Sequence, residues 1–270
     1  MDSIVLSEQE IAEQKMHPNT LKMAKHFFDS RGFLKIDNLF SSLFIETLAE
    51  EYEKRLDWSE DRQSLCSGVK VSDKRYIVPI ALTGPFSDST LYANPLLMPL
   101  LESILGAKLI VGSMGAITSL PGALEQHIHA DYRLLFEETP EFSCSIPTYG
   151  ITFAVPLIDI DCVNGPTKVW AGSHRTYPID QKMDSYARHL VSGKIGSCYF
   201  WDYRTFHAGG ANHSDLPRSL LYMSYTRCWF KDFFNPERLE IDPIQYQSLS
   251  EQQKKLFLSL QNQVKMQNVS

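Results

Sequence analysis

The sequence predicts an α+β protein with a mainly β core, a double-sheet jelly roll with flanking helices, and two observations support this. Helix signals dominate residues 1–107, whereas residues 108–232 consist of β-branched and aromatic runs bounded by Gly, Pro, Asn and Asp. Such a division is typical of α+β folds in which helices pack outside a pair of sheets. We therefore expect a single domain over residues 1–270, closed by a C-terminal helix over about 250–264.

Three helices are expected in the first part, where apolar residues recur every three to four positions between start and stop residues. The first runs from Pro18 to the stop at Gly32, and the other two cover 42–55 and 94–105. The amphipathic stretch near the C-terminus is expected to pack on the core rather than on a partner. Strands are expected over 33–36, 108–119, 149–158, 197–200 and 219–229.

Composition excludes several classes of function. The formal net charge is −6 and 43% of residues are hydrophobic. An acidic chain lacks the concentrated basic face that nucleic acids require, so a small-molecule substrate is expected. No apolar run approaches the roughly 20 residues that span a bilayer, and the first residues do not resemble a secretory signal, so we expect a cytoplasmic protein. The five cysteines are scattered and are expected to be reduced thiols. The oligomeric state stays open, with a homodimer as one option.

Three residues have the chemistry of an open metal centre. His129 and Asp131 are two positions apart, so on a strand their side chains would share one face. His207 lies far downstream, where another strand can bring it to the same place. Two histidines and one carboxylate leave about three positions open on an octahedral ion, which is typical of non-haem Fe(II) oxygenases. A structural zinc site would instead be closed by four ligands.

An arginine follows the third candidate ligand. Arg218 comes after a turn of Gly, Asn, Ser, Asp and Pro. Its guanidinium can pair bidentately with a carboxylate, as the distal end of a dicarboxylic cosubstrate requires while its other end chelates the metal. The alternative is a solvated surface arginine. An H-x-D tripeptide alone is weak support for a metal site, and the arginine strengthens it.

Three motifs occur along the chain: His129-x-Asp131, Asn164-Gly-Pro-Thr167 leading to Gly172-Ser-His-Arg175, and Tyr203-Arg-Thr-Phe-His207-x-Gly-Gly-x-Asn212. Together they resemble the phytanoyl-CoA dioxygenase-like (PhyH) family of Fe(II)/2-oxoglutarate-dependent oxygenases. The run ending at Asn212 is closer to the natural-product tailoring enzymes than to the acyl-CoA hydroxylases. One departure is Ala171, where the family usually has proline. The resemblance implies a double-stranded β-helix, the cupin-like jelly roll.

The resemblance also implies the reaction. Fe(II) held by His129, Asp131 and His207 would use 2-oxoglutarate and O₂ to oxidise an unactivated C–H bond of a small, mostly apolar metabolite, releasing succinate and CO₂. Hydroxylation, desaturation and rearrangement are the expected outcomes, with ascorbate as a supporting reductant. Asp131 argues against halogenation, because the related halogenases replace this carboxylate with a small residue.

Further site residues follow from the resemblance one at a time. Gln126, Thr167 and Arg75 match positions that contact 2-oxoglutarate in relatives. Each also has an ordinary alternative as a turn, strand or surface residue. His127 is expected to point away from His129 and not to be a ligand. The candidate substrate contacts, which could equally be core residues, are Tyr132, Phe136, Phe206, Trp229 and Arg227.

Two other classes of function stay open. An acyl-CoA hydroxylase of the same family would need a basic rim for the CoA phosphates. A cupin-type metalloenzyme that does not use 2-oxoglutarate would not need Arg218. A sensor protein would be expected to lose one of the residues His129, Asp131, His207 and Arg218. The candidates for a basic rim are Lys70, Lys74, Arg133 and Arg175.

Overall fold

Two β-sheets form the centre of the protein, which is described here by a computed structural model. The structure describes residues 3–54, 69–132, 134–176, 183, 186–233 and 239–260. Within these residues the large sheet has the strand order β1-β2-β9-β6-β11-β5-β4-β3, and the small sheet has the order β10-β7-β8. The large sheet consists of β1 (Ile4–Val5), β2 (Phe33–Asp37), β3 (Val69–Ser72), β4 (Arg75–Pro79), β5 (Leu109–Ser119), β6 (Gly150–Pro156), β9 (Cys198–Asp202) and β11 (Arg218–Arg227). The small sheet consists of β7 (Thr167–Trp170), β8 (Arg188–Val191) and β10 (His207–Gly209).

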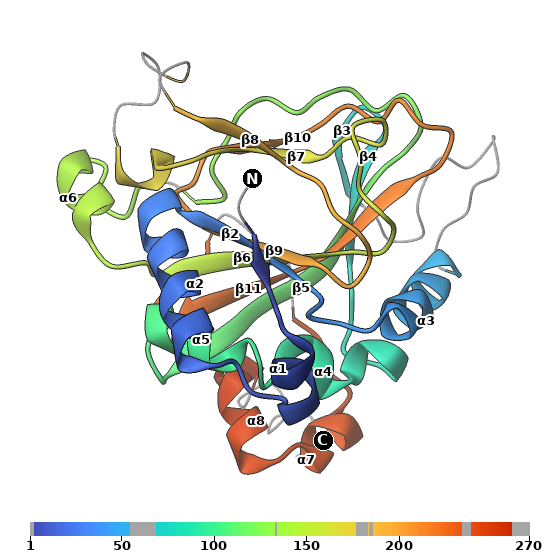
Figure 1. Ribbon diagram of the computed structural model, residues 1–270, viewed down its shortest axis with the longest axis vertical. Coiled ribbons are helices and arrows are strands. Elements are labelled where there is room, and N and C mark those ends of the chain that lie inside the picture. Colours follow the sequence, from blue (N-terminus) through green and yellow to red (C-terminus); the bar gives the residue numbers. More distant parts are fainter. Residues whose placement is uncertain are drawn as a thin grey trace.

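Helices cover the side of the large sheet that faces away from the small sheet (Figure 1). The longest begins at Pro18, whose missing N–H costs nothing at a helix start, and ends at Gly32 with φ 77°. The helices are α1 (Glu8–Glu13), α2 (Pro18–Arg31), α3 (Ser42–Glu53), α4 (Ser89–Tyr92), α5 (Met98–Leu105), α6 (Pro140–Ser145), α7 (Pro243–Ser248) and α8 (Glu251–Leu256). None of the described helices is long and apolar enough to cross a membrane.

The long pair β5 and β11 sets the geometry of the site. The two strands run antiparallel from the pair Arg218–Ser119 to the pair Arg227–Leu109, with a bulge after Ser224. One face of the large sheet packs on the helices through a core that includes Met114, and alternate residues on the other face point toward the small sheet. This sandwich with outer helices confirms the predicted fold class.

Several elements differ from the sequence prediction. The first 107 residues contribute four strands, β1 to β4, to the large sheet, so the part expected to be helical is not separate from the β core. The helix expected over 94–105 begins only at Met98, because the Asn94 side chain accepts a hydrogen bond from the Leu96 N–H in a preceding turn. Near the C-terminus, α8 ends at Leu256 and a 3₁₀ turn follows at Leu258–Leu260. Residues 261–264 of the expected helix lie outside the described chain.

Candidate metal centre and active site

The backbone brings His129 and His207 together. The His129 N–H donates to the His207 carbonyl (3.0 Å), and the His207 N–H donates to the His129 carbonyl (2.8 Å). This pair is an isolated antiparallel bridge, so the H-x-D motif lies in a loop that touches β10 and not in a continuous strand as expected. The two imidazole rings lie with their centroids 4.4 Å apart.

Each histidine presents the same nitrogen to the space between them. His129 Nδ1 lies 2.9 Å from the carbonyl of His127, and His207 Nδ1 lies 3.0 Å from the carbonyl of Thr205. A carbonyl can only accept, so both Nδ1 atoms carry the hydrogen. This leaves each Nε2 with its lone pair for a metal, the usual arrangement when a backbone carbonyl orients a histidine ligand.

Asp131 completes the centre. Its Oδ2 accepts hydrogen bonds from Thr152 Oγ1 (2.5 Å) and Trp201 Nε1 (2.7 Å), while its Oδ1 lies 3.3 Å from His207 Nε2. Ligand atoms of Asp131 and the two histidines all lie within 4.8 Å of one another. Two neutral nitrogens and one oxygen in this arrangement fit an Fe(II) ion with open positions.

The local electrostatics favour an ionised Asp131 and a neutral His129, and they favour positive charge on His207. Burial and the neighbouring His207 lower the pKa of His129 to about 4. Burial raises the pKa of Asp131, but His207 and the donors to its carboxylate outweigh burial and hold the pKa below its usual range. Burial lowers the pKa of His207, and the Asp131 carboxylate more than reverses this, so the net shift is upward. The centre therefore attracts positive charge next to a permanent carboxylate.

Two buried arginines lie at one end of the same space. Arg75 on β4 and Arg218 on β11 are the cross-strand neighbours of Ser119 on β5, and both are at most 1% exposed. Nε and Nη1 of Arg75, and Nε and Nη2 of Arg218, have no hydrogen-bond partner among the described residues. Burial lowers the pKa of Arg218 to about 9, with a further contribution from Arg75, and burial lowers that of Arg75 to about 10. Buried, unpaired guanidiniums strongly favour a bound carboxylate.

Backbone groups contact the Arg75 and Gln126 side chains on one side of this space. Arg75 Nη2 donates to the carbonyls of Leu124 and Gly210, each at 3.0 Å. Gln126 Oε1 accepts from the Gly209 N–H at 2.9 Å, and Thr167 is the β7 partner of Gly209. The positions carried over from the resemblance therefore meet around β10.

The metal centre and the arginines open into one cavity of about 440 Å³. Its walls include the three metal-ligand candidates, both arginines, Gln126 and Thr167. The remaining described lining residues are mostly apolar, and among them are Val71, Ile77, Ile117, Ala154, Leu220 and Tyr222.

Comparison with known proteins decides the family. The family model described as Phytanoyl-CoA dioxygenase (PhyH) matches residues 28–220. The protein belongs to the PhyH family. The family predicted from the motifs is therefore confirmed, and with it an Fe(II)/2-oxoglutarate-dependent dioxygenase. The grouped side chains of His129, Asp131 and His207 are compatible with a metal site.

Relatives and solved structures agree with this PhyH assignment. Ectoine dioxygenase of Bordetella parapertussis is 25% identical over 248 residues, covering 80% of this chain and 78% of the relative. HygX from Streptomyces hygroscopicus, solved with nickel and 2-oxoglutarate, matches with a TM-score of 0.62 and 18% identity over 78% of this chain and 88% of its own. The epimerase SnoN, solved with Fe³⁺, alpha ketoglutarate and nogalamycin RO, matches with a TM-score of 0.61 and 17% identity over 78% and 85%. The structural matches show that the fold is shared.

The five residues expected to contact substrate lie elsewhere among the described residues. Tyr132 packs against Phe230, with ring centroids 4.8 Å apart, and Phe206 lies in a small core cluster. Phe136 and Trp229 are exposed. Arg227 donates to the carbonyls of Thr148 and Ile104. None of the five lines the cavity, because their backbone directs them to the small core clusters or outward.

Other cavity residues of this PhyH protein were missed by sequence reasoning. Leu220, Tyr222 and Ser224 line the cavity and follow Arg218 at every second position of β11. That alternation could have identified them once Arg218 was assigned to a strand. His127 also lines the cavity, with its ring centroid 5.3 Å from that of His129. The expectation that it points away from His129 is wrong, because residues two positions apart share one face of an extended chain.

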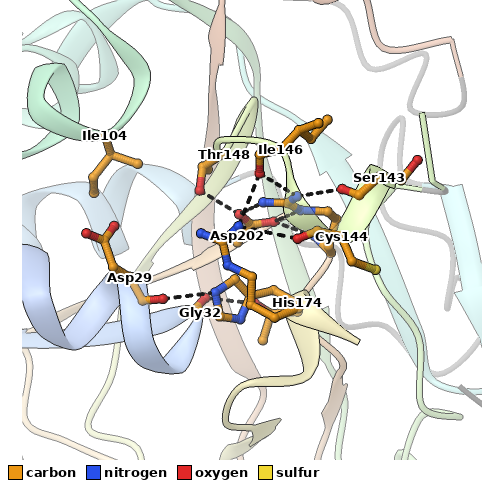
Figure 2. Close-up of polar contacts among 12 residues, drawn as sticks. Asp29, Gly32, Ile104, Ser143, Cys144, Ile146, Thr148, His174 and Asp202 are labelled. Carbon is orange, nitrogen blue, oxygen red and sulfur yellow. Dashed lines mark hydrogen bonds and ion pairs between the residues drawn. The ribbon is translucent and has the colours of Figure 1, made fainter. Parts of the chain in front are cut away.

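A buried ion pair between Arg204 and Asp202 lies at the end of β9 (Figure 2). Arg204 Nη2 lies 2.7 Å from Asp202 Oδ2, and Asp202 also accepts from Thr148 Oγ1 at 2.7 Å. Arg204 Nη1 donates to the carbonyls of Ser143 (2.8 Å) and Ile146 (3.0 Å). The pair thus connects the end of β9 to α6 and the segment after it. His174 lies at the edge of this group and contacts the Asp29 carbonyl through Nε2 at 3.3 Å.

Gly209 makes room for the side chains of Arg75 and Gln126. A Cβ at this position would lie 2.5 Å from both Arg75 Nη1 and Gln126 Oε1. Two carbonyls hold the Arg75 guanidinium through Nη2, and the Gly209 N–H holds Gln126 Oε1, so both groups have little freedom to move. Gly209→Ala is therefore expected to displace Arg75 and raise the KM for 2-oxoglutarate about 10- to 100-fold, the cost of one hydrogen bond to a charged group. Steady-state succinate formation measures this. Ala208→Gly, whose side chain points to the other face of β10, is the control, and an equal KM in wild type and Gly209→Ala would contradict the role given to Arg75.

Proposed function

We propose that the protein oxidises an unactivated C–H bond of a small, mostly apolar metabolite in a natural-product pathway, with 2-oxoglutarate as cosubstrate. The observation that carries this proposal is a single cavity in which an open His-Asp-His centre faces two buried guanidiniums with unpaired N–H groups. A metalloenzyme that does not use a dicarboxylic acid would have no reason to bury both cations.

Different residues of the cavity have different roles in the proposed reaction. His129, Asp131 and His207 would hold Fe(II), and when bound the iron supplies the activation of O₂. Arg218 and Arg75 bind the distal carboxylate of 2-oxoglutarate and so orient its oxoacid end toward the metal ligands. Thr152 and Trp201 hold the Asp131 carboxylate so that Oδ1 faces inward. The apolar wall excludes water from the reacting C–H bond.

The charges around the cavity favour a natural product over an acyl-CoA. Among the described residues that line the cavity, the only lysine or arginine side chains are Arg75 and Arg218. Arg175 instead donates to the carbonyls at the end of α6, and exposed Lys70 pairs with Asp73. Lys74 does not line the cavity either, and Arg133 lies outside the described residues. A CoA thioester would need several cations for its phosphates.

The relatives point in the same direction. SnoN is an epimerase from nogalamycin biosynthesis, and HygX has been solved with hygromycin B bound. These structures share the fold with this chain and support a natural product as the substrate.

Turnover of 2-oxoglutarate tests the proposal. Purified protein with Fe(II), ascorbate and O₂ is expected to convert 2-oxoglutarate to succinate, and a metabolite panel including ectoine, an acyl-CoA, terpenoids and polyketides is expected to accelerate this only with neutral or weakly polar members. Absence of succinate would refute 2-oxoglutarate use. Acceleration by the acyl-CoA well above every free metabolite would favour the acyl-CoA hydroxylase instead.

A further inference from the structure

The cavity floor runs along β11 between two polar ends. Arg218, Leu220, Tyr222 and Ser224 all line the cavity at alternate positions of this strand. At about 3.3 Å per residue, the six steps from Arg218 to Ser224 cover about 20 Å. A five-carbon dicarboxylic acid bound by Arg218 is far shorter than this, so the part of the floor near Ser224 is left for another molecule.

The end at Ser224 lies in one row with the residues that support the metal ligand. Ser224 pairs with Ser113 on β5 and with Thr152 on β6, and Thr152 pairs in turn with Trp201 on β9. Thr152 and Trp201 are the two donors to the Asp131 carboxylate. The two serines are therefore neighbours of the metal centre on the side away from the arginines, where a substrate has to lie to reach the iron.

The two serines form a hydroxyl pair with unused hydrogen-bonding capacity. Ser113 Oγ and Ser224 Oγ lie 2.8 Å apart, both residues are buried, and both line the cavity. Each hydroxyl has one donor hydrogen and two acceptor lone pairs, so after one bond between them the pair still has a free hydrogen and free lone pairs. The described side chains near this end include no lysine, arginine or glutamate in the cavity wall.

We propose that the Ser113–Ser224 hydroxyl pair recognises a neutral hydrogen-bonding group, a hydroxyl or carbonyl, on the otherwise apolar prime substrate. The inference rests on the proposed function, since it names the class of molecule that this oxygenase accepts. A neutral group fits because no lysine or arginine lies in the described cavity wall at this end, and the nearby Asp131 carboxylate already accepts hydrogen bonds from Thr152 and Trp201. The apolar residues Ile117, Leu220 and Ala154 along the floor fit the remaining hydrocarbon.

The same two strands provide a matched control. Thr118 Oγ1 and Ser219 Oγ also lie 2.8 Å apart across β5 and β11, and both residues are buried. Their side chains point to the opposite face of the sheet and do not line the cavity. Ser219→Ala therefore removes a comparable buried hydroxyl from β11 without changing the cavity.

The test compares binding by wild type, Ser224→Ala, Ser113→Ala/Ser224→Ala and Ser219→Ala. Each protein is loaded with Ni(II) and 2-oxoglutarate to prevent turnover. Ligand-observed NMR then measures the binding of two series, each of a hydrocarbon, its alcohol and its ketone: bornane, borneol and camphor, and decalin, decalol and decalone. Wild type is expected to bind the alcohols and ketones more tightly than the hydrocarbons. The double variant is expected to lose about five- to tenfold of that affinity, as for one or two neutral hydrogen bonds, and Ser219→Ala none.

Other results would overturn the inference. These are no binding of any oxygenated member, equal binding of hydrocarbons and alcohols by wild type, or equal loss in Ser219→Ala and the double variant. Thermal unfolding of the four proteins reports whether each variant is folded, and Ser224→Ala, which keeps one hydroxyl, provides a milder variant. Succinate formation without prime substrate is expected to be the same in wild type and Ser219→Ala. Absence of succinate in wild type would refute the proposed function, whereas unchanged succinate with no preference for oxygenated ligands would refute only this inference.

Discussion

Asp131→Ala is expected to abolish iron-supported turnover while leaving the protein folded. Asp131 is the only anionic member of the His-Asp-His set, and its removal leaves two neutral imidazoles to hold a divalent cation. Mutating an outer-shell partner of a metal ligand typically costs 10- to 100-fold in affinity, so loss of the ligand itself is expected to exceed 100-fold. Fe(II) titration monitored together with succinate formation measures both effects.

Two further variants serve as comparisons for Asp131→Ala. Thr152→Val removes only one donor to the Asp131 carboxylate and is expected to weaken Fe(II) binding by the smaller, outer-shell amount. Asp215→Ala removes an exposed carboxylate from the turn before β11 and is expected to change neither quantity. Equal iron affinity and equal succinate production in wild type and Asp131→Ala would refute the assignment of the metal ligands.

Arg218→Met is expected to raise the KM for 2-oxoglutarate by about 30-fold or more. Truncating one partner of a buried, charge-assisted pair typically costs about 2–5 kcal/mol, and each 1.4 kcal/mol is tenfold. Because Arg218 is a buried cation with unpaired N–H groups in the cosubstrate-free protein, methionine is also expected to raise the thermal stability in that state. A KM increase in a more stable protein separates lost recognition from lost folding.

Two further variants test which arginine binds the distal carboxylate of 2-oxoglutarate. Arg75→Met is expected to raise the KM by a smaller factor, since Arg75 already donates to two carbonyls. Arg188→Met removes an exposed cation from β8 and is expected to leave the KM unchanged. An unchanged 2-oxoglutarate dependence in Arg218→Met together with a steep increase in Arg75→Met would move the carboxylate anchor to Arg75.

The parts of the fold that sequence predicts are those with strong local signals. The helix from Pro18 to Gly32 and the strands β5, β6 and β11 have clear stop residues or long apolar runs, and they appear nearly as expected. The strands of the small sheet were not predicted. They have three or four residues each, and β10 reads His-Ala-Gly, so neither length nor alternation separates them from a loop.

The same distinction applies to the site. The metal ligands and Arg218 are identifiable because their residue types and order have a chemical reason. The residues that line the rest of the cavity are not identifiable from the sequence. Whether an aromatic residue such as Phe206 points into the cavity or into a core cluster depends on pairing between distant strands. Ser113 on β5 and Ser224 on β11 have no signal of their own until the register between these two strands is known.

Within the ion pair with Asp202, Arg204 holds the end of α6 through the carbonyl oxygens of Ser143 and Ile146, and Arg175 adds a bond to the carbonyl of Cys144. Every amino acid supplies a carbonyl, so these contacts place no demand on side-chain identity between residues 143 and 146. Natural selection can therefore exchange residues 143–146 without loosening these contacts. The guanidiniums of Arg204 and Arg175 keep the backbone of this segment in place while its side chains vary.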